Sequence, residues 1–290
     1  MEQQKQNNYP LQLIPQINIK DSTESYVCYQ APGSTEVETW RALRMITSTK
    51  TIESVNSISL AEKVADAFAI FSKTLNSFDA NSLNIVIPIF HNLEIRLKQL
   101  KIATKQDKSG RKESVKHLIN FCFEQNNFVV DIAGFSQKLP VRVTHNDTKI
   151  SNLLFDSKGL NPVAVIDLDT CMPDFLMNDF GDMVRTCCSN LAEDAIDLEN
   201  MHIRTDIFAV LAKGYIQSIG EEITDLERRS LILGAQLLPF ICGVKILTDY
   251  LNGDVYFSIK HQQHNQQRAE INCIFMRSWH NQKKSCLSTF

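Results

Sequence analysis

Hydrophobic residues recur at helical spacing in the first third of the chain. They fall three or four positions apart, at Leu60, Val64, Phe68, Phe71 and Leu75. This spacing places them on one face of a helix. Residues 59–62 read Ser-Leu-Ala-Glu, a capping box in which a serine and a glutamate satisfy free backbone N–H groups. The pattern therefore predicts a core-facing helix that begins near Ser59.

A second capping box precedes a longer apolar segment. Residues 224–227 read Thr-Asp-Leu-Glu, and an apolar run continues through Leu231, Leu237 and Leu238. Pro239 follows within the run. Because proline has no backbone N–H to donate, we expect a long buried helix with a kink at this position.

Short runs rich in β-branched and aromatic residues predict strands in two regions. In the front of the chain these runs cover residues 11–15, 24–29 and 40–46, and in the middle they cover residues 141–143, 153–155 and 163–166. Residues 156–159, Asp-Ser-Lys-Gly, read as a turn. This turn joins the last two runs into a hairpin, whose register predicts Asn152 and Asp167 side by side.

A string of polar residues lies beside this hairpin. Residues 145–152 read His-Asn-Asp-Thr-Lys-Ile-Ser-Asn, and residues 166–169 read Ile-Asp-Leu-Asp. A single His-x-Asp is weak evidence of function, because both residues are common in loops. The full string, followed by a strand, a turn, a strand and an acidic end, favours a phosphoryl-transfer loop with a metal-binding carboxylate.

Each residue of the string suits one task in phosphoryl transfer. The carboxylate of Asp147 can accept the proton of a substrate hydroxyl while it stays ionised at neutral pH. Lys149 projects to the same side in an extended loop and can steady the charge of the moving phosphoryl group. Asn152 and Asp167 offer the oxygen ligands that Mg²⁺ prefers. We expect His145 to brace the loop rather than to react.

Composition narrows the class of protein. The 290-residue chain is 43% hydrophobic and 22% charged, with a net charge of −3, so it can bury a core and has no basic footprint for nucleic acid. Residues 1–10 are polar, and no later run approaches the ~20 apolar residues of a membrane span, so we expect neither a secretion signal nor an anchor. The eight cysteines are scattered in apolar runs without zinc spacing, which predicts reduced thiols in a cytoplasmic protein.

These motifs resemble the aminoglycoside phosphotransferase and choline kinase family. The resemblance rests on residues 143–149, 165–173, 179–185 and 247–257, followed by His264 and Asn265. It implies an α+β, protein-kinase-like fold, with a mostly helical large lobe, a β-rich small lobe, and ATP and Mg²⁺ as cofactors. More narrowly, the chain is similar to bacterial N-acetylhexosamine 1-kinases, which phosphorylate the anomeric hydroxyl of an amino sugar.

The same resemblance implies further roles. Asp179 begins an Asp-Phe-Gly triplet, but by the resemblance it braces the catalytic loop from the next helix, and Asp167 is the metal ligand. The residues that the resemblance places near the acceptor are Asp169, Tyr256, Lys245, His91 and Asn92, and it places the nucleotide hinge near Met45 and Ile46. The family has arginine at the position of Lys245, and the two side chains are not equivalent at a bidentate site.

The front of the chain departs from the family pattern. Gly33 is the only glycine before Gly110, so no glycine-rich loop can cover the phosphates, and no lysine is well placed to grip them. We therefore expect residues 1–46 to be a truncated small lobe and residues 47–290 the large lobe. Three alternatives stay open: a sugar kinase, a kinase for another small alcohol such as an aminoglycoside or amino alcohol, and a catalytically impaired binding protein. The sequence does not define the oligomeric state.

Overall fold

The computed structural model describes residues 2–14, 16–17, 25–193, 195 and 198–287, with the side chains of these residues up to Trp279 except that of Gln16. The α-helices are α1 (Glu2–Gln6), α2 (Ile58–Thr74), α3 (Leu93–Gln106), α4 (Lys116–Phe123), α5 (Asn126–Ser136), α6 (Leu176–Cys187), α7 (Thr205–Ile219), α8 (Asp225–Asn252) and α9 (His264–Leu287). The strands are β1 (Gln16–Ile17), β2 (Tyr26–Tyr29), β3 (Glu38–Leu43), β4 (Thr49–Lys50), β5 (Arg142–Thr144), β6 (Leu153–Asp156), β7 (Pro162–Val165) and β8 (Met172–Asp174).

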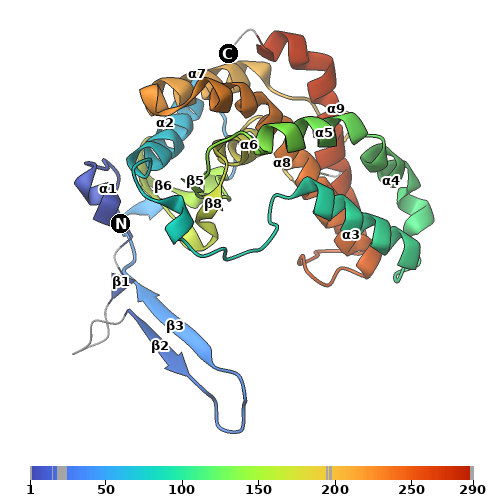
Figure 1. Ribbon diagram of the computed structural model, residues 1–290, viewed down its shortest axis with the longest axis horizontal. Helices are drawn as coiled ribbons and strands as arrows, with labels where there is room; N and C mark the ends of the chain where they lie inside the picture. The colour runs from blue at the N-terminus through green and yellow to red at the C-terminus, as the bar shows by residue number, and fades with distance from the viewer. Residues whose placement is uncertain (1, 15, 18–24, 194, 196–197, 288–290) are drawn as a thin grey trace.

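The helices gather into one body, and a small sheet projects from it (Figure 1). Within the body α8 packs against α3, α6 and α9, while α2 packs against α7. Strands β1, β3 and β2 form a separate antiparallel sheet in that order. Every residue of β2 and β3 is exposed, including Trp40 at 62%. The core therefore lies among the helices and not under this sheet.

The predicted core helix forms, but it begins earlier than expected. The predicted cap at Ser59 is wrong, because Ser57 has the extended backbone of an N-cap and its side chain accepts the N–H of Leu60. The apolar face is confirmed, since Leu60, Val64, Phe68 and Phe71 are buried. Ser59 is the second residue of the helix and therefore cannot be its N-cap.

The second helix start is confirmed in detail. The Thr224 side chain accepts the N–H of Glu227, and the Glu227 carboxylate accepts the N–H of Thr224. Helix α8 then continues through Pro239 to Asn252. Among the described residues α8 is also the one helix apolar and long enough to cross a membrane, but 83% of its apolar window is buried in the protein.

Two glycines bring α6 and α8 into close contact. A Cβ added at Gly234 would lie 1.8 Å from the backbone oxygen of Met177, and one at Gly181 would lie 2.2 Å from the oxygen of Gly234. Real Cβ atoms do not approach backbone this closely, so only glycine fits at both positions. This contact sets the position of α6, which carries Asp179 and Asp182.

The middle strands are confirmed, and the front strands only in part. Strands β6 and β7 pair antiparallel, with Leu153 opposite Val165, and β4 pairs with the other side of β6. In the front, β2 and β3 match two predicted runs, although β3 ends at Leu43. The predicted strand at 11–15 is wrong for residues 11–14, which lie along the large lobe, where the N–H of Gln12 donates to Val163 O. Helix α1 packs against α2, and Asn7 Nδ2 donates to Thr74 O at 2.7 Å.

Candidate active site

The polar string at 145–152 forms the loop between β5 and β6. Strand β5 pairs antiparallel with β8, and both Thr144 and His145 are fully buried. Asn146 takes a left-handed backbone with φ 65°, which asparagine tolerates better than most residues. The loop therefore turns sharply after His145 and brings Asp147 toward the surface.

Asp179 holds this loop from the first turns of α6. Its carboxylate accepts the backbone N–H groups of His145 at 2.9 Å and Asn146 at 2.7 Å. Thr148 Oγ1 also donates to the backbone oxygen of Asp179. Burial raises the pKa of Asp179 to about 7, against the opposing effect of the two N–H donors. These contacts have the geometry of a brace, while the effect on catalysis stays a prediction.

His145 fixes the loop from the other side. Its Nε2 lies 2.9 Å from Ile166 O, and its Nδ1 accepts the N–H of Asp147 at 3.3 Å. Nε2 is therefore the protonated atom, as assigned from these partners. Burial lowers the pKa of His145, so the ring is neutral at pH 7. A neutral imidazole with both nitrogens occupied is suited to hold the loop and not to exchange protons.

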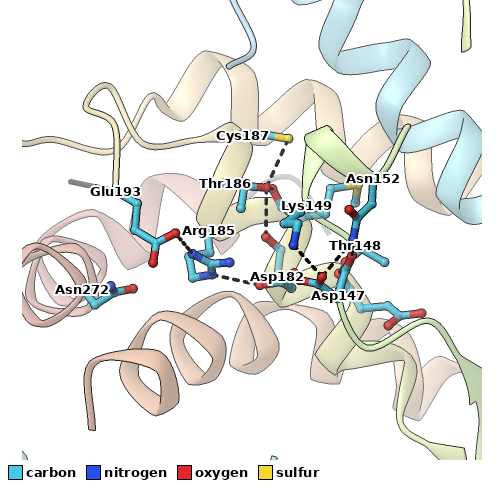
Figure 2. Close-up of polar contacts among 12 residues, drawn as sticks. Asp147, Thr148, Lys149, Asn152, Asp182, Arg185, Thr186, Cys187, Glu193 and Asn272 are labelled. Carbon is cyan, nitrogen blue, oxygen red and sulfur yellow. Dashed lines mark hydrogen bonds and ion pairs between the residues drawn. The ribbon is translucent and has the colours of Figure 1, made fainter. Parts of the chain in front are cut away.

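Asp147 carries two polar neighbours from its own loop (Figure 2). Lys149 Nζ donates to Asp147 Oδ2 at 2.7 Å, and Asn152 Nδ2 donates to the same oxygen at 2.8 Å. The Asp147 side chain is 24% exposed, so the carboxylate is accessible. Lys149 and Asp147 thus lie on the same side of the loop, as the sequence predicts.

Asp167 follows β7 at the edge of the same loop. The N–H of Ile166 donates to Asn152 O at 2.9 Å, so the hairpin places Asp167 one residue from a direct contact with Asn152. Burial lowers the pKa of Lys149, but the hydrogen bond to Asp147 and the charges of Asp147, Asp167 and Asp182 outweigh it and raise this pKa. The charges of both predicted acidic residues therefore act on the same ammonium group, and their joint role in one site stays a prediction.

The oxygen atoms at this site fit a hard cation. The Nδ2 of Asn152 donates hydrogen bonds to Asp147, so the Oδ1 of Asn152 is the atom that could bind a metal. Asp167 supplies a carboxylate. Among the described residues, no group of three or more His, Cys, Asp and Glu side chains could hold a metal by itself. Two protein ligands are what Mg²⁺ uses when phosphate oxygens and water complete its shell.

The residues predicted near the nucleotide lie toward the projecting sheet. Met45 is 81% exposed, and Ile46 O accepts the hydroxyl of Thr49 at 2.9 Å. Asp169 forms an ion pair with Arg41 of β3. This pair links the projecting sheet to the segment after Asp167, and the predicted substrate role of Asp169 stays untested.

Of the predicted acceptor residues, His91 and Asn92 line a cavity of about 300 Å³, and Tyr256, Lys245 and Asp169 occur in the lining of neither described cavity. Tyr256 is 73% exposed, and its N–H donates to Asp249. Lys245 Nζ lies 4.2 Å from the centroid of the Phe90 ring, and burial lowers its pKa. His91 bonds to Asp174, while Asn92 caps α3 by accepting the N–H of Ile95. Their roles toward an acceptor stay predictions.

A cavity of about 790 Å³ opens beside the catalytic loop instead. Its polar lining comes from the loop, α6, the segment after α6, and α9, and includes Lys149, Arg185, Glu193, Arg204, Arg268 and Asn272. Arg185 donates to Asp182 at 2.9 Å and to Glu193 at 3.3 Å, and Arg268 donates to Glu193 at 2.7 Å. Figure 2 shows Asp182, Arg185 and Glu193 of this network, and separately the contact of Lys149 with Asp147.

Sequence reasoning missed this network. Asp182 and Arg185 stand three residues apart on a helix, which is a usable local signal for an ion pair. Nothing local connects them to Glu193 or to Arg268 on α9. Asp182 is 4% exposed, and its Oδ2 has no hydrogen-bond partner among the described residues.

Solved structures with a similar fold are small-molecule kinases and phosphotransferases. An aminoglycoside phosphotransferase from Alicyclobacillus acidocaldarius is 14% identical, with a TM-score of 0.59 over 97% of this chain and 80% of its own. A microcompartment-associated aminopropanol kinase is 12% identical, with a TM-score of 0.57 over 96% and 78%. A choline kinase from Cryptosporidium parvum is 12% identical, with a TM-score of 0.52 over 86% and 74%. This likeness confirms the predicted kinase-like α+β fold.

The sequence itself places the chain in a family. Residues 37–207 match the model of the phosphotransferase enzyme family, and the chain belongs to that family. The matched region contains the catalytic loop, Asp167 and Asp179.

Proposed function

We propose that this protein is an ATP-dependent phosphotransferase that acts on a hydroxyl group of a sugar, as the N-acetylhexosamine 1-kinases do. The observation that carries the proposal is the contact set of Asp147. The carboxylate is accessible, and Lys149 and Asn152 hold it at 2.7 and 2.8 Å. In this role Asp147 orients the acceptor hydroxyl and takes its proton.

Other residues of the loop complete the site. Asn152 and Asp167 would hold Mg²⁺, which when bound neutralises charge on the nucleotide phosphates. When the acceptor hydroxyl replaces Lys149 as the hydrogen-bond donor to Asp147, the ammonium group of Lys149 would turn toward the transferred phosphoryl group. Asp179 and His145 keep the loop in position for these steps. We extend the proposal to a cytoplasmic location, which the free thiols of the seven described cysteines support.

The charge of the large cavity supports a neutral acceptor over an amine. Lys149, Arg185, Arg204 and Arg268 line it, against the carboxylates of Glu53 and Glu193. Two arginines bind Glu193, and despite the opposing effect of burial their charges lower its pKa to about 2. This carboxylate is therefore already paired. Lys149 and Arg185 are likewise paired, with Asp147 and Asp182. An aminoglycoside or amino alcohol would have to compete with the arginines for Glu193, whereas sugar hydroxyl and acetamido groups can bond to these side chains without displacing an ion pair.

Acceptor kinetics test the proposal. We expect Mg²⁺- and ATP-dependent turnover of N-acetylglucosamine or N-acetylgalactosamine, measured as ADP release. Protonated glucosamine and ethanolamine should be poorer by ~5-fold or more in kcat/KM, because an ammonium group would have to displace an ion pair of Glu193, at a cost of ~1 kcal/mol. Turnover of ethanolamine but not of the sugars would refute the sugar assignment and leave an amino alcohol kinase.

A substitution tests the proposed base. Asp147→Asn should lower kcat by ~10²–10⁴, the usual contribution of a general base, with little change in KM for ATP. Asp131→Asn, which alters an exposed carboxylate of α5, is the matched control and should keep wild-type turnover. Equal turnover of Asp147→Asn and wild type would remove Asp147 from the reaction.

A further inference from the structure

A second cavity, of about 300 Å³, lies on another part of the large lobe. It is bounded by residues 85–94, α5, β8 and the start of α6. It shares no lining residue with the large cavity beside Lys149. Most of its wall is apolar and comes from Ile85, Ile87, Phe90, Val129, Ile132 and Met172. Its size is at the lower end for small-molecule sites in proteins.

Three connected polar residues form part of this wall. His91 Nδ1 lies 2.9 Å from Asp174 Oδ2, and Asn178 Nδ2 donates to Asp174 Oδ1 at 2.7 Å. A carboxylate only accepts, which fixes both the Asn178 amide and the His91 ring. Asn178 is 2% exposed, and its Oδ1 has no hydrogen-bond partner among the described residues. The wall therefore offers the acceptor Asn178 Oδ1, and with a neutral ring whose Nδ1 donates to Asp174 it also offers His91 Nε2.

The charges of this wall favour a ligand that has a positively charged hydrogen-bond donor. Asp174 and Glu94 are the acidic residues of the lining, and neither lysine nor arginine occurs in it. Glu94 pairs with Lys98 at the exposed rim, so Asp174 supplies most of the negative charge inside. Lys245 contacts the wall through the ring of Phe90 and is not itself in the lining.

The loop at the mouth of the cavity is strained and apolar. Ile89 has φ 57°, a left-handed conformation that a β-branched residue rarely adopts. Its side chain is 40% exposed, and that of Ile85 is 54% exposed. Backbone strain of this kind is often found where a loop contacts a ligand. An apolar ligand body would cover both isoleucines.

We infer that this cavity is a second binding site, which takes a small amphipathic amine. The apolar body lies against Ile132 and Phe90, and the amine donates to Asn178 Oδ1 and His91 Nε2 close to the charge of Asp174. An amine satisfies both acceptors at once, which an apolar molecule cannot do and a single hydroxyl does only in part. The inference does not depend on the proposed kinase activity.

The site is tested by measuring the binding of 2-phenylethylamine to the full chain with calorimetry or protein NMR. We expect a dissociation constant of ~1 mM or lower, as is reasonable for a ligand of this size. The neutral analogue 2-phenylethanol should bind ~10-fold more weakly, and ethylbenzene should be weaker still. No binding of the amine at ~10 mM, or equal binding of the amine and the alcohol, would overturn the inference.

Two variants locate the binding. Ala133→Trp places a large side chain in the lining from an exposed position of α5, so it should fold normally and abolish binding. Asn178→Leu removes the unpaired oxygen at nearly constant volume and should weaken amine binding ~10-fold or more while it leaves ethylbenzene binding in place. Asn272→Leu is the matched control, because Asn272 is 3% exposed and lines the other cavity, and amine binding should not change. Unchanged binding in Ala133→Trp would place the amine elsewhere and refute the site.

Discussion

The buried carboxylate of Asp179 predicts an unusual dependence of stability on pH. Its side chain is 1% exposed, and its pKa is raised to about 7 from 3.8, first by burial and then by the charges of Asp174 and Asp182. The folded protein therefore keeps a proton that the unfolded chain releases above pH ~4. This contribution to stability is fully present below pH ~4 and is lost as the pH rises through about 7.

The expected magnitude follows from the displaced pKa. A pKa of about 7 in the folded protein against 3.8 in the unfolded chain corresponds to ~4 kcal/mol in the free energy of unfolding. Asp179→Asn has the same shape and does not titrate. The free energy of unfolding of the variant, relative to wild type, should thus rise by ~4 kcal/mol between pH 4 and pH 8.

Urea unfolding followed by circular dichroism at several pH values measures this difference. Asp131→Asn is the control, and its difference from wild type should stay constant over the same range. A constant difference for Asp179→Asn would refute the reasoning. It would mean that the N–H groups of His145 and Asn146 compensate fully for the burial of the charge.

The remaining predictions concern packing and the large cavity. Gly234→Ala would drive a Cβ into the backbone of Met177, so it should lower the free energy of unfolding by ~3 kcal/mol or more. Gly134→Ala is the control, because its Cβ meets no atom within 4 Å, and it should be neutral or stabilising. Chemical unfolding compares the two variants, and equal stability would contradict the close contact of α6 with α8. Glu193→Gln should cost ~1 kcal/mol at pH 7, a modest value because the side chain is 41% exposed. Since its pKa is lowered to about 2, this difference should be complete above pH ~4.5 and shrink toward pH 3; a difference that grows on acidification would contradict the ion-pair assignment.

The sequence was most informative where the determinants are local. The turn at 156–159 and its flanking apolar runs predict the hairpin that places Asn152 beside Ile166. The capping box at the start of α8 is likewise a contact between two residues three positions apart, Thr224 and Glu227. In both cases the sequence spacing fixes the geometry, and the structure agrees.

Prediction from the sequence was weaker where contacts between distant segments decide the structure. Ser57 and Ser59 are both plausible caps in sequence, and only the backbone conformation selects Ser57. The cavity network joins Arg185 to Glu193 and Arg268, which come from different segments with no shared periodicity. Lys149 was expected at the transferred phosphoryl group and His91 near the acceptor, and the two residues line separate cavities, the second of which is built with Asp174 of β8 and Asn178 of α6.

The most direct test of the central claim, that Asp147 and Asp167 serve one phosphoryl-transfer site, is ³¹P NMR of the protein with ATP, Mg²⁺ and N-acetylglucosamine. The account predicts a sugar phosphate signal that grows as the γ-phosphate signal of ATP declines, and its loss in both Asp147→Asn and Asp167→Asn. A sugar phosphate signal that persists in either variant at the wild-type rate, or no sugar phosphate from the wild-type protein, would contradict it.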